Sequence, residues 1–290
     1  MVINHNMSAL FANRHLEFTT VDTDKSIQKL ASGMRINSAG DDASGLAVSE
    51  KMRSQYRGLA AATKNAQNGI SFLQVSEGYL GEMQDMLQRV RELAIQAANG
   101  IYSDEDRALI QREVNQLVDE VDRIASHAEF NKMNMLTGRF GKAANAQTMA
   151  IHVGANMDQR IQFFIGTMTA GALGIRGGAA AAGAAGAQGE TISISNVNKA
   201  NQTLGRVDQA ITKVIAQRSD LGAYSNRMEH IVKGLSIATE NTIASESRIR
   251  DTDMAGQMVE YVKNQILTQS GASMLASANT KNQVVLKLLG

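Results

Sequence analysis

Two adjacent carboxylates, Asp41 and Asp42, could serve as a general acid and base or as metal ligands. They follow Gly40 and directly precede a segment with helical periodicity that begins at Ala43. Carboxylates at a helix start accept hydrogen bonds from the free backbone N–H groups, and the helix dipole favours their charge. We therefore interpret this pair as a helix cap at a hinge rather than as a catalytic site.

The other residues of catalytic type do not form a recognisable site. Asp22 and Asp24 have the spacing of a calcium-binding loop, but Ile27 stands where that loop needs glycine. A tract rich in glycine and alanine at 177–189 lacks the lysine and hydroxyl residue of a phosphate-binding loop. No metal or nucleophile motif accompanies the five histidines, His5, His15, His127, His152 and His230. The sequence predicts neither an enzyme nor a cofactor.

A cluster of mixed charge interrupts the apolar periodicity near residue 250. One interpretation is a solvated surface, because exposed ion pairs contribute little stability. The other is a hinge whose ion pairs lie between helices of one chain or between subunits. The cluster consists of Glu246, Arg248, Arg250, Asp251 and Asp253.

The composition indicates that long helices position these residues. The 290 residues include no proline, so helices longer than the usual three or four turns are allowed. The 29 basic and 28 acidic residues give a formal charge of +1 without a cluster of one sign, which disfavours nucleic-acid binding. No run of about 18 apolar residues predicts a membrane span. Residues 1–11 also lack the features of a secretory signal.

Alternating steps of four and three residues predict three long helices. The first covers residues 43–98, is roughly 80 Å long and is stopped by Gly100. Its apolar seam, which starts at Val48, contains three poor seam residues, Gln55, Gly69 and Ser76. A second helix begins after the N-cap Ser103, and a third begins near residue 196. We expect the three helices to pack antiparallel.

A different pattern separates the second and third helices. Alternating apolar residues on both sides of a turn-prone segment predict a β-hairpin at about 148–165. The tract at 177–189 cannot bury enough surface to form a core, so we expect an exposed loop.

The two chain ends carry apolar residues at helical spacing and should form a two-helix pair. Such a thin pair buries little surface and needs neighbours, which polymerisation would supply. The residues expected to drive polymerisation are Ile3, Met7, Leu10, Val262, Ile266 and Leu288.

The predicted fold is therefore mainly α. It comprises a long antiparallel coiled-coil rod, built as a three-helix bundle with a small β-hairpin, and a two-helix terminal coiled coil. The terminal helices form one discontinuous domain, 1–42 with 246–290. The rod domain covers 43–176 and 190–245.

Several segments resemble those of bacterial flagellins. Residues 30–49, LASGMRINSAGDDASGLAVS, are similar to the N-terminal flagellin signature, and residues 88–96, QRVRELAIQ, to a helical motif. Residues 246–255, ESRIRDTDMA, resemble the C-terminal motif. Within the family the chain most resembles spirochaete core flagellins, on the strength of residues 3–9, 100–103 and 154–160.

The resemblance implies a structural subunit that polymerises with itself into the filament of a periplasmic flagellum. It implies export by the flagellar type III apparatus with a chaperone, which agrees with the missing secretory signal. Further implied partners are sheath or coat proteins and hook-associated junction and cap proteins. A hook–filament junction protein or a secreted helical adhesin is the alternative, and an extracellular surface filament is the alternative location.

Family likeness also suggests roles for individual residues. The hinge or subunit contacts would involve Arg35, Asp41, Asp42, Arg248, Arg250, Asp251 and Asp253. In related flagellins the helix around residue 90 is contacted by an innate immune receptor, so receptor or subunit contacts would involve Arg89, Leu93 and Glu113. O-linked sugars, as found in relatives, would attach to Thr148, Thr167 or Thr169.

Overall fold

The computed structural model describes residues 6–142, 147–176 and 192–289, with the backbone alone for 281–289. The chain divides into two units, Met1–Tyr56 with Thr239–Gly290, and Arg57–Ala238. The division falls inside two long helices, α2 (Ala43–Ala98) and α5 (Val197–Arg250). From the sequence we expected the domain boundary at helix ends, after residue 42 and before residue 246. That boundary stays a prediction. The expected loop at 177–189 lies outside the described residues.

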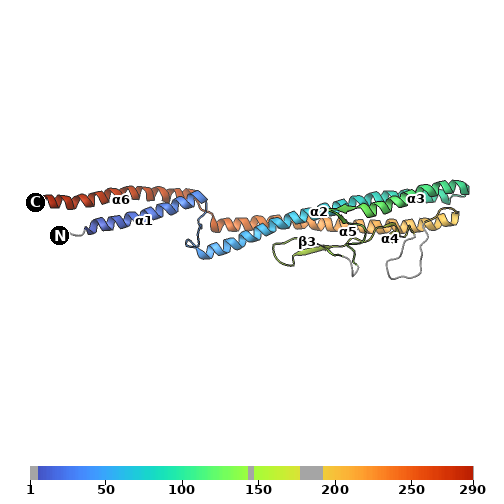
Figure 1. Ribbon diagram of the computed structural model, residues 1–290, viewed down its shortest axis with the longest axis horizontal. Coiled ribbons are helices and arrows are strands. Elements are labelled where there is room, and N and C mark those ends of the chain that lie inside the picture. The colour runs from blue at the N-terminus through green and yellow to red at the C-terminus, as the bar shows by residue number, and fades with distance from the viewer. Residues whose placement is uncertain (1–5, 143–146, 177–191, 290) are drawn as a thin grey trace. The chain divides into compact units, whose positions relative to one another are not determined.

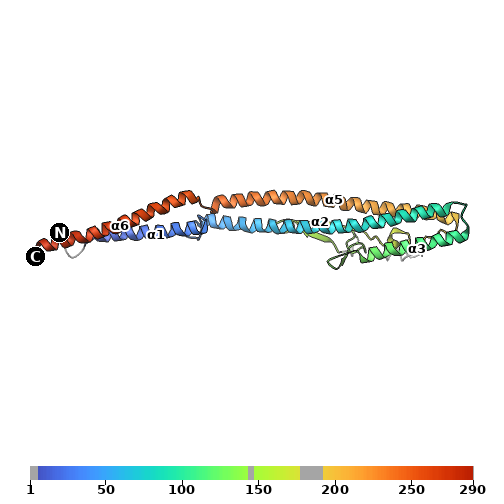
Figure 2. The ribbon, with the colours of Figure 1, turned by 90° about the horizontal axis from the view of Figure 1, so that it is seen from above.

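In the first unit, α1 (Met7–Ser32) and α6 (Met254–Leu289) lie side by side and antiparallel (Figures 1 and 2). Asn6 caps α1, because its side chain accepts a hydrogen bond from the Ala9 amide at 3.1 Å. The same side chain donates to the carbonyl of Ala278 at 3.0 Å. The predicted two-helix terminal pair is confirmed.

The segments that join these helices to α2 and α5 pair with each other through the backbone. The amide of Arg35 donates to the carbonyl of Arg250 at 2.7 Å, and the amide of Thr252 donates to Gly33 at 3.1 Å. Met34 and Asp251 form an antiparallel bridge between these two bonds. Gly33 adopts a φ of 70°, a conformation that glycine adopts readily, and so ends α1.

In the second unit, α2 and α5 pack with α3 (Asp104–His127) as the predicted three-helix bundle (Figures 1 and 2). Ser103 begins α3 through a reciprocal capping box with Asp106. Arg107 closes the turn between α2 and α3. Its guanidinium donates to the carbonyls of Ala97 at 3.0 Å and Asn99 at 3.2 Å.

The seam of α2 is buried at every predicted position from Leu59 to Ala97. At Gly69 an added Cβ would lie 2.4 Å from Cδ1 of Ile151, so the Ile151 side chain would have to shift. The Ser76 hydroxyl donates to the carbonyl of Phe72 and lies 2.9 Å from Sδ of Met135. Two of the three poor seam residues, Gly69 and Ser76, therefore mark the places where non-helical segments dock on α2, whereas Gln55 is exposed.

Those segments include the predicted hairpin, in which β3 (Met149–His152) pairs antiparallel with β4 (Arg160–Phe163). Two further elements escaped prediction. A tight hairpin joins β1 (Glu129–Phe130) to β2 (Met133–Asn134), and a single helical turn, α4, covers Ala170–Leu173. Both are too short to produce a periodic pattern.

Helix α5 buries several small and polar residues in the core, while some of its larger apolar residues are only partly buried. The buried positions include Thr203, Ala210 and Gln217, whereas Leu204 and Ile211 are only partly buried. Gln217 takes a seam position because its side chain accepts a hydrogen bond from the Gly166 amide at 2.9 Å. The buried edge of α5 thus contacts the segment after β4.

Candidate assembly surface

The facing surfaces of α1 and α6 combine small and polar residues with a few large ones, such as Leu16, Leu30 and Leu275. Ser26 is the single buried residue of α1, and the described part of α6 has none. Half-buried residues recur at steps of three and four along both helices, as a coiled-coil seam requires. They are Ala9, Ala12, Leu16, Thr19, Thr23 and Leu30 on α1, and Gln257, Tyr261, Asn264, Thr268, Gly271, Leu275 and Ala278 on α6.

Polar groups in this seam are satisfied within their own helices. The hydroxyls of Thr23, Ser26 and Thr268 each donate to a carbonyl four residues earlier, at 2.7 to 2.9 Å. Such bonds allow the hydroxyls to be covered without an unpaired donor. The two helices can therefore approach each other closely along these hydroxyl groups, and these positions contribute little apolar burial.

Many large apolar side chains of α1 and α6 lie outside the seam. Exposed fractions are 52% for Met7 and 64% for Leu10 on α1, and 45% for Val262 and 60% for Ile266 on α6. The sequence had assigned these four residues to polymerisation, and they remain uncovered within one chain. Ile3 lies outside the described residues, as does the side chain of Leu288. Further exposed apolar residues on the two helices are Phe11, Phe18, Val21, Ile27, Met254, Met258, Val259, Leu267 and Met274.

A pair with this arrangement leaves much of its large apolar surface exposed to water. Fully burying one such side chain stabilises by about 1.5–3 kcal/mol relative to leaving it in water. Contiguous exposed apolar surface marks a binding interface in soluble proteins. The exposed faces of α1 and α6 can therefore bind other apolar surfaces, because binding removes them from water. These exposed apolar residues of α1 and α6 are named the assembly surface below.

The predicted hinge residues lie beside this surface, in and around the paired linkers. Arg35 donates from its guanidinium to the carbonyl of Ile249 at 2.8 Å, in addition to its backbone bond to Arg250. The buried Arg250 side chain pairs with Glu50 of α2. This ion pair, with further help from Arg53, lowers the pKa of Glu50. Sequence reasoning missed Glu50 because its partner is 200 residues away.

Asp41 and Asp42 act locally. The amides of Ser38 and Asn37 hydrogen-bond to the Asp41 carboxylate and lower its pKa. The Asp42 carboxylate accepts from the Gly45 amide at 2.9 Å at the start of α2, and this bond lowers its pKa. These bonds agree with the expected capping function.

The remaining hinge residues also make local contacts. Asp251 accepts from the Ser247 hydroxyl, Arg248 donates to the Ser245 hydroxyl, and Asp253 accepts from the Ala255 amide at 3.0 Å. All of these contacts lie within a few residues of the charge cluster. A role between subunits stays a prediction for the whole set.

The residues expected to meet a receptor or another subunit divide into two kinds. Arg89 and Glu113 are exposed and form an ion pair at 2.9 Å between α2 and α3. Leu93 is 3% exposed and packs in the hydrophobic core of its own chain. Among the threonines, Thr148 and Thr167 are exposed, whereas Thr169 is half-buried and caps α4. Contacts and sugars at these sites stay predictions.

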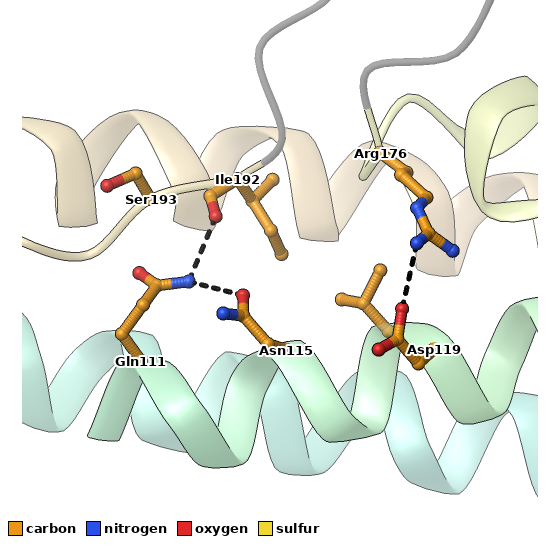
Figure 3. Close-up of a pocket in the computed structure, with 7 residues that line it drawn as sticks. Gln111, Asn115, Asp119, Arg176, Ile192 and Ser193 are labelled. Carbon is orange, nitrogen blue, oxygen red and sulfur yellow. Dashed lines mark hydrogen bonds and ion pairs between the residues drawn. The ribbon is translucent and has the colours of Figure 1, made fainter. Parts of the chain in front are cut away.

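A polar cavity of about 420 Å³ lies between α3 and the segments before and after residues 177–191 (Figure 3). Its polar side chains engage one another: Gln111 bonds to Asn115 and to the carbonyl of Ile192, and Arg176 pairs with Asp119 at 3.0 Å. Gln111 also accepts from the Ile194 amide. These contacts fix the returning chain onto α3 rather than present free catalytic groups.

Within the described ranges, no group of three or more His, Cys, Asp and Glu residues is arranged to hold a metal ion. The helices were also searched for membrane spans, and none in the described part combines the necessary length and hydropathy.

The chain combines a helical bundle with a helix pair that leaves large apolar residues exposed. This combination is typical of proteins that assemble with copies of themselves. Sequence comparison agrees. Residues 3–140 match the bacterial flagellin N-terminal helical region, and residues 204–289 match the bacterial flagellin C-terminal helical region. The chain belongs to the bacterial flagellin family and is a structural subunit of the flagellar filament.

Particular relatives come from spirochaetes. The chain is 60% identical to the flagellar filament 31.3 kDa core protein of Treponema maltophilum over 293 aligned positions, with 100% of both chains covered. It is 59% identical to a flagellar filament core protein of Brachyspira hyodysenteriae, with the same coverage. The resemblance to spirochaete core flagellins is confirmed.

A solved structure from Vibrio parahaemolyticus, described as a flagellar hook-associated protein, is similar in fold. The TM-score is 0.57 at 13% identity, with 73% of this chain and 100% of that chain covered. At this identity the likeness shows the fold alone.

Proposed function

We propose that the assembly surface joins copies of this chain into the filament core. The support is the exposure of its large side chains: the intramolecular seam covers Leu16, Leu30 and Leu275 among small and polar residues, while many other leucine, isoleucine, phenylalanine and methionine side chains remain exposed. A second copy is the fitting occupant because the chain is a filament subunit and every copy carries the same two faces. Burial in the polymer is the mechanism, and no catalytic step is needed.

Subunit addition would then be coupled to covering the apolar faces. Anything that binds the folded chain and not the unfolded one stabilises it, and neighbouring subunits act in this way. The terminal pair, weakly packed by itself, would gain most of its stability on joining the filament. Hydrogen exchange tests this coupling: amides of α1 and α6 should exchange much more slowly in filaments than in soluble subunits. Equal rates in both forms would contradict the proposal.

A periplasmic location is proposed from the likeness to spirochaete core flagellins. The implied partners are sheath or coat proteins, hook-associated junction and cap proteins, an export chaperone and the type III export apparatus. Electron cryotomography of cells tests the location. Filaments lying between the inner and outer membranes support it, and filaments protruding from the cell surface would establish the external location.

Abundance separates a filament subunit from a hook–filament junction protein. A filament subunit should be the main band of a sheared filament preparation, whereas a junction protein would be a trace component. Intact mass of the same preparation tests glycosylation of Thr148, Thr167 or Thr169. A mass equal to that of the unmodified chain would rule out sugars at all three.

Receptor recognition at Arg89 and Glu113 is the less favoured role of that exposed pair, and subunit packing is the favoured one. Charge reversal at both positions together preserves their mutual ion pair. If subunit packing holds, the double reversal should weaken filament assembly. Unchanged assembly with lost receptor binding would favour the receptor instead.

A further inference from the structure

Most of the exposed methionines in the described part of the chain lie on the assembly surface. The sequence has 15 methionines and no cysteine, so methionine is its only sulfur-containing side chain. Five described methionines are exposed, and four of them lie on α1 and α6. The exposed fractions are 52% for Met7, 47% for Met254, 47% for Met258, 64% for Met274 and 88% for Met157.

Methionines of the second unit are arranged differently. Met83, Met135 and Met228 are completely buried in the core. Met157 is the exposed exception and lies between β3 and β4 of the second unit, outside α1 and α6. The chain therefore contains a natural control for a methionine that is accessible but is not on α1 or α6.

The exposed methionines of α6 belong to an apolar row. Met254, Met258, Val262 and Ile266 follow one another at four-residue intervals, so each is a surface neighbour of the next. Met274 lies two such intervals beyond Ile266. A polar atom on the sulfur of Met254 or Met258 would interrupt this row, whereas Ser270 separates Met274 from it.

We propose that Met7, Met254, Met258 and Met274 are oxidation sites at which sulfoxide formation blocks subunit assembly. The proposal rests on the proposed assembly surface. The oxidant is hydrogen peroxide: its O–O bond breaks, one oxygen atom bonds to Sδ, and the other leaves as water. The thioether is oxidised by two electrons and the peroxide is reduced by two. Methionine sulfoxide reductases reverse this lesion in proteins.

Sulfoxide formation converts a flexible apolar side chain into a polar one. A polar group buried at an interface without a hydrogen-bond partner weakens association, on the order of tenfold per site. The soluble subunit should therefore be sensitive to peroxide. The filament should be resistant, because the same four sulfurs are covered by neighbouring subunits.

The test compares peroxide treatment before and after polymerisation of the purified full chain. Peptide mass spectrometry measures oxidation at each methionine, and sedimentation measures the critical concentration. In soluble subunits all five exposed methionines should oxidise, and the critical concentration should rise at least about tenfold. In preformed filaments Met157 should oxidise readily while the four sites of α1 and α6 are protected.

Leucine variants localise the effect, because leucine has a similar volume and resists peroxide. A variant with all four sites changed to leucine should polymerise equally well with and without treatment. Met157→Leu should remain as sensitive as the unchanged chain. If the fourfold variant polymerises poorly untreated, the protection of the four sites in unchanged filaments remains the deciding measurement.

Two results would overturn the proposal. One is normal polymerisation of subunits whose four sites are fully oxidised, and the other is equal oxidation of these sites in subunits and filaments. The substitution Ile266→Asp distinguishes this failure from that of the assembly surface, because it introduces charge there without any oxidation. If Ile266→Asp blocks assembly but oxidised subunits polymerise, the oxidation proposal alone is wrong.

Discussion

Replacing Ile266 tests whether the assembly surface is covered in the filament. This side chain is 60% exposed in the single chain and belongs to the apolar row of α6. Ile266→Ala removes most of the apolar surface that a neighbour would bury, and Ile266→Asp places a charge there. Both should leave α6 helical, because the residue lies on its exposed face.

The expected effect follows from the exposed fraction. Complete burial of an isoleucine stabilises by about 1.5–3 kcal/mol. Since 60% of Ile266 remains exposed in the chain, neighbours would add about 1–2 kcal/mol. One factor of ten in an equilibrium constant corresponds to about 1.4 kcal/mol, so Ile266→Ala should raise the critical concentration about 5- to 30-fold. Ile266→Asp buries an unpaired charge and should abolish polymerisation.

Sedimentation across a concentration series measures the critical concentration, and electron microscopy verifies the pellet. Circular dichroism of the soluble fraction checks that helix content is retained. Ile266→Val is the matched control, because it keeps an apolar branched side chain and should polymerise almost normally. Filaments of Ile266→Asp at the unchanged critical concentration would refute the reasoning.

Three further predictions concern stability and pH. Gly69→Ala should destabilise the chain by about 1–3 kcal/mol, because its Cβ would meet Ile151. Gly78 has open space around it, so Gly78→Ala should stabilise the chain by about 0.5–1 kcal/mol. Thermal unfolding that ranks the two variants the other way would contradict the packing. Arg107→Ala should cost about 2–3 kcal/mol, because two carbonyls lose a charged donor; an unchanged denaturant midpoint would show that the turn does not need it. The lowered pKa of Asp41 contributes stability above the ordinary value of 3.8 that is lost as the pH falls below it, so the protection of α1–α2 linker amides, measured relative to their intrinsic exchange rates, should fall there. Asp41→Asn should remove that dependence, and a linker whose protection is equally pH-dependent in this variant would contradict the assignment.

The long helices were predictable because their signals are local. The bounds expected for the first long helix, 43–98, are those of α2, since Asp42 caps its start and Gly100 follows its end. A strict four–three repeat left one register for the α2 seam. In α5 the polar Gln217 took a core position through contacts with the segment after β4, and no local pattern could show this.

The candidate site was predictable only in part. Periodicity identified Leu10, Val262 and Ile266 as residues that share apolar faces, but it cannot show what covers a face. Apolar residues meet only in part within the pair, because Leu16 and Leu275 share the seam with Thr19, Thr23 and Gly271. Contacts between residues far apart in sequence, such as Glu50 with Arg250, also have no local signal.

The paired linkers depend on main-chain donors at two positions, Arg35 and Thr252. Side-chain replacements at either position keep the amide hydrogen, so this crossing tolerates wide variation in residue type. Proline is the exception, because it has no N–H to donate. At these two linker positions proline is thus as unfavourable as in the helix interiors, in a chain of 290 residues that contains none.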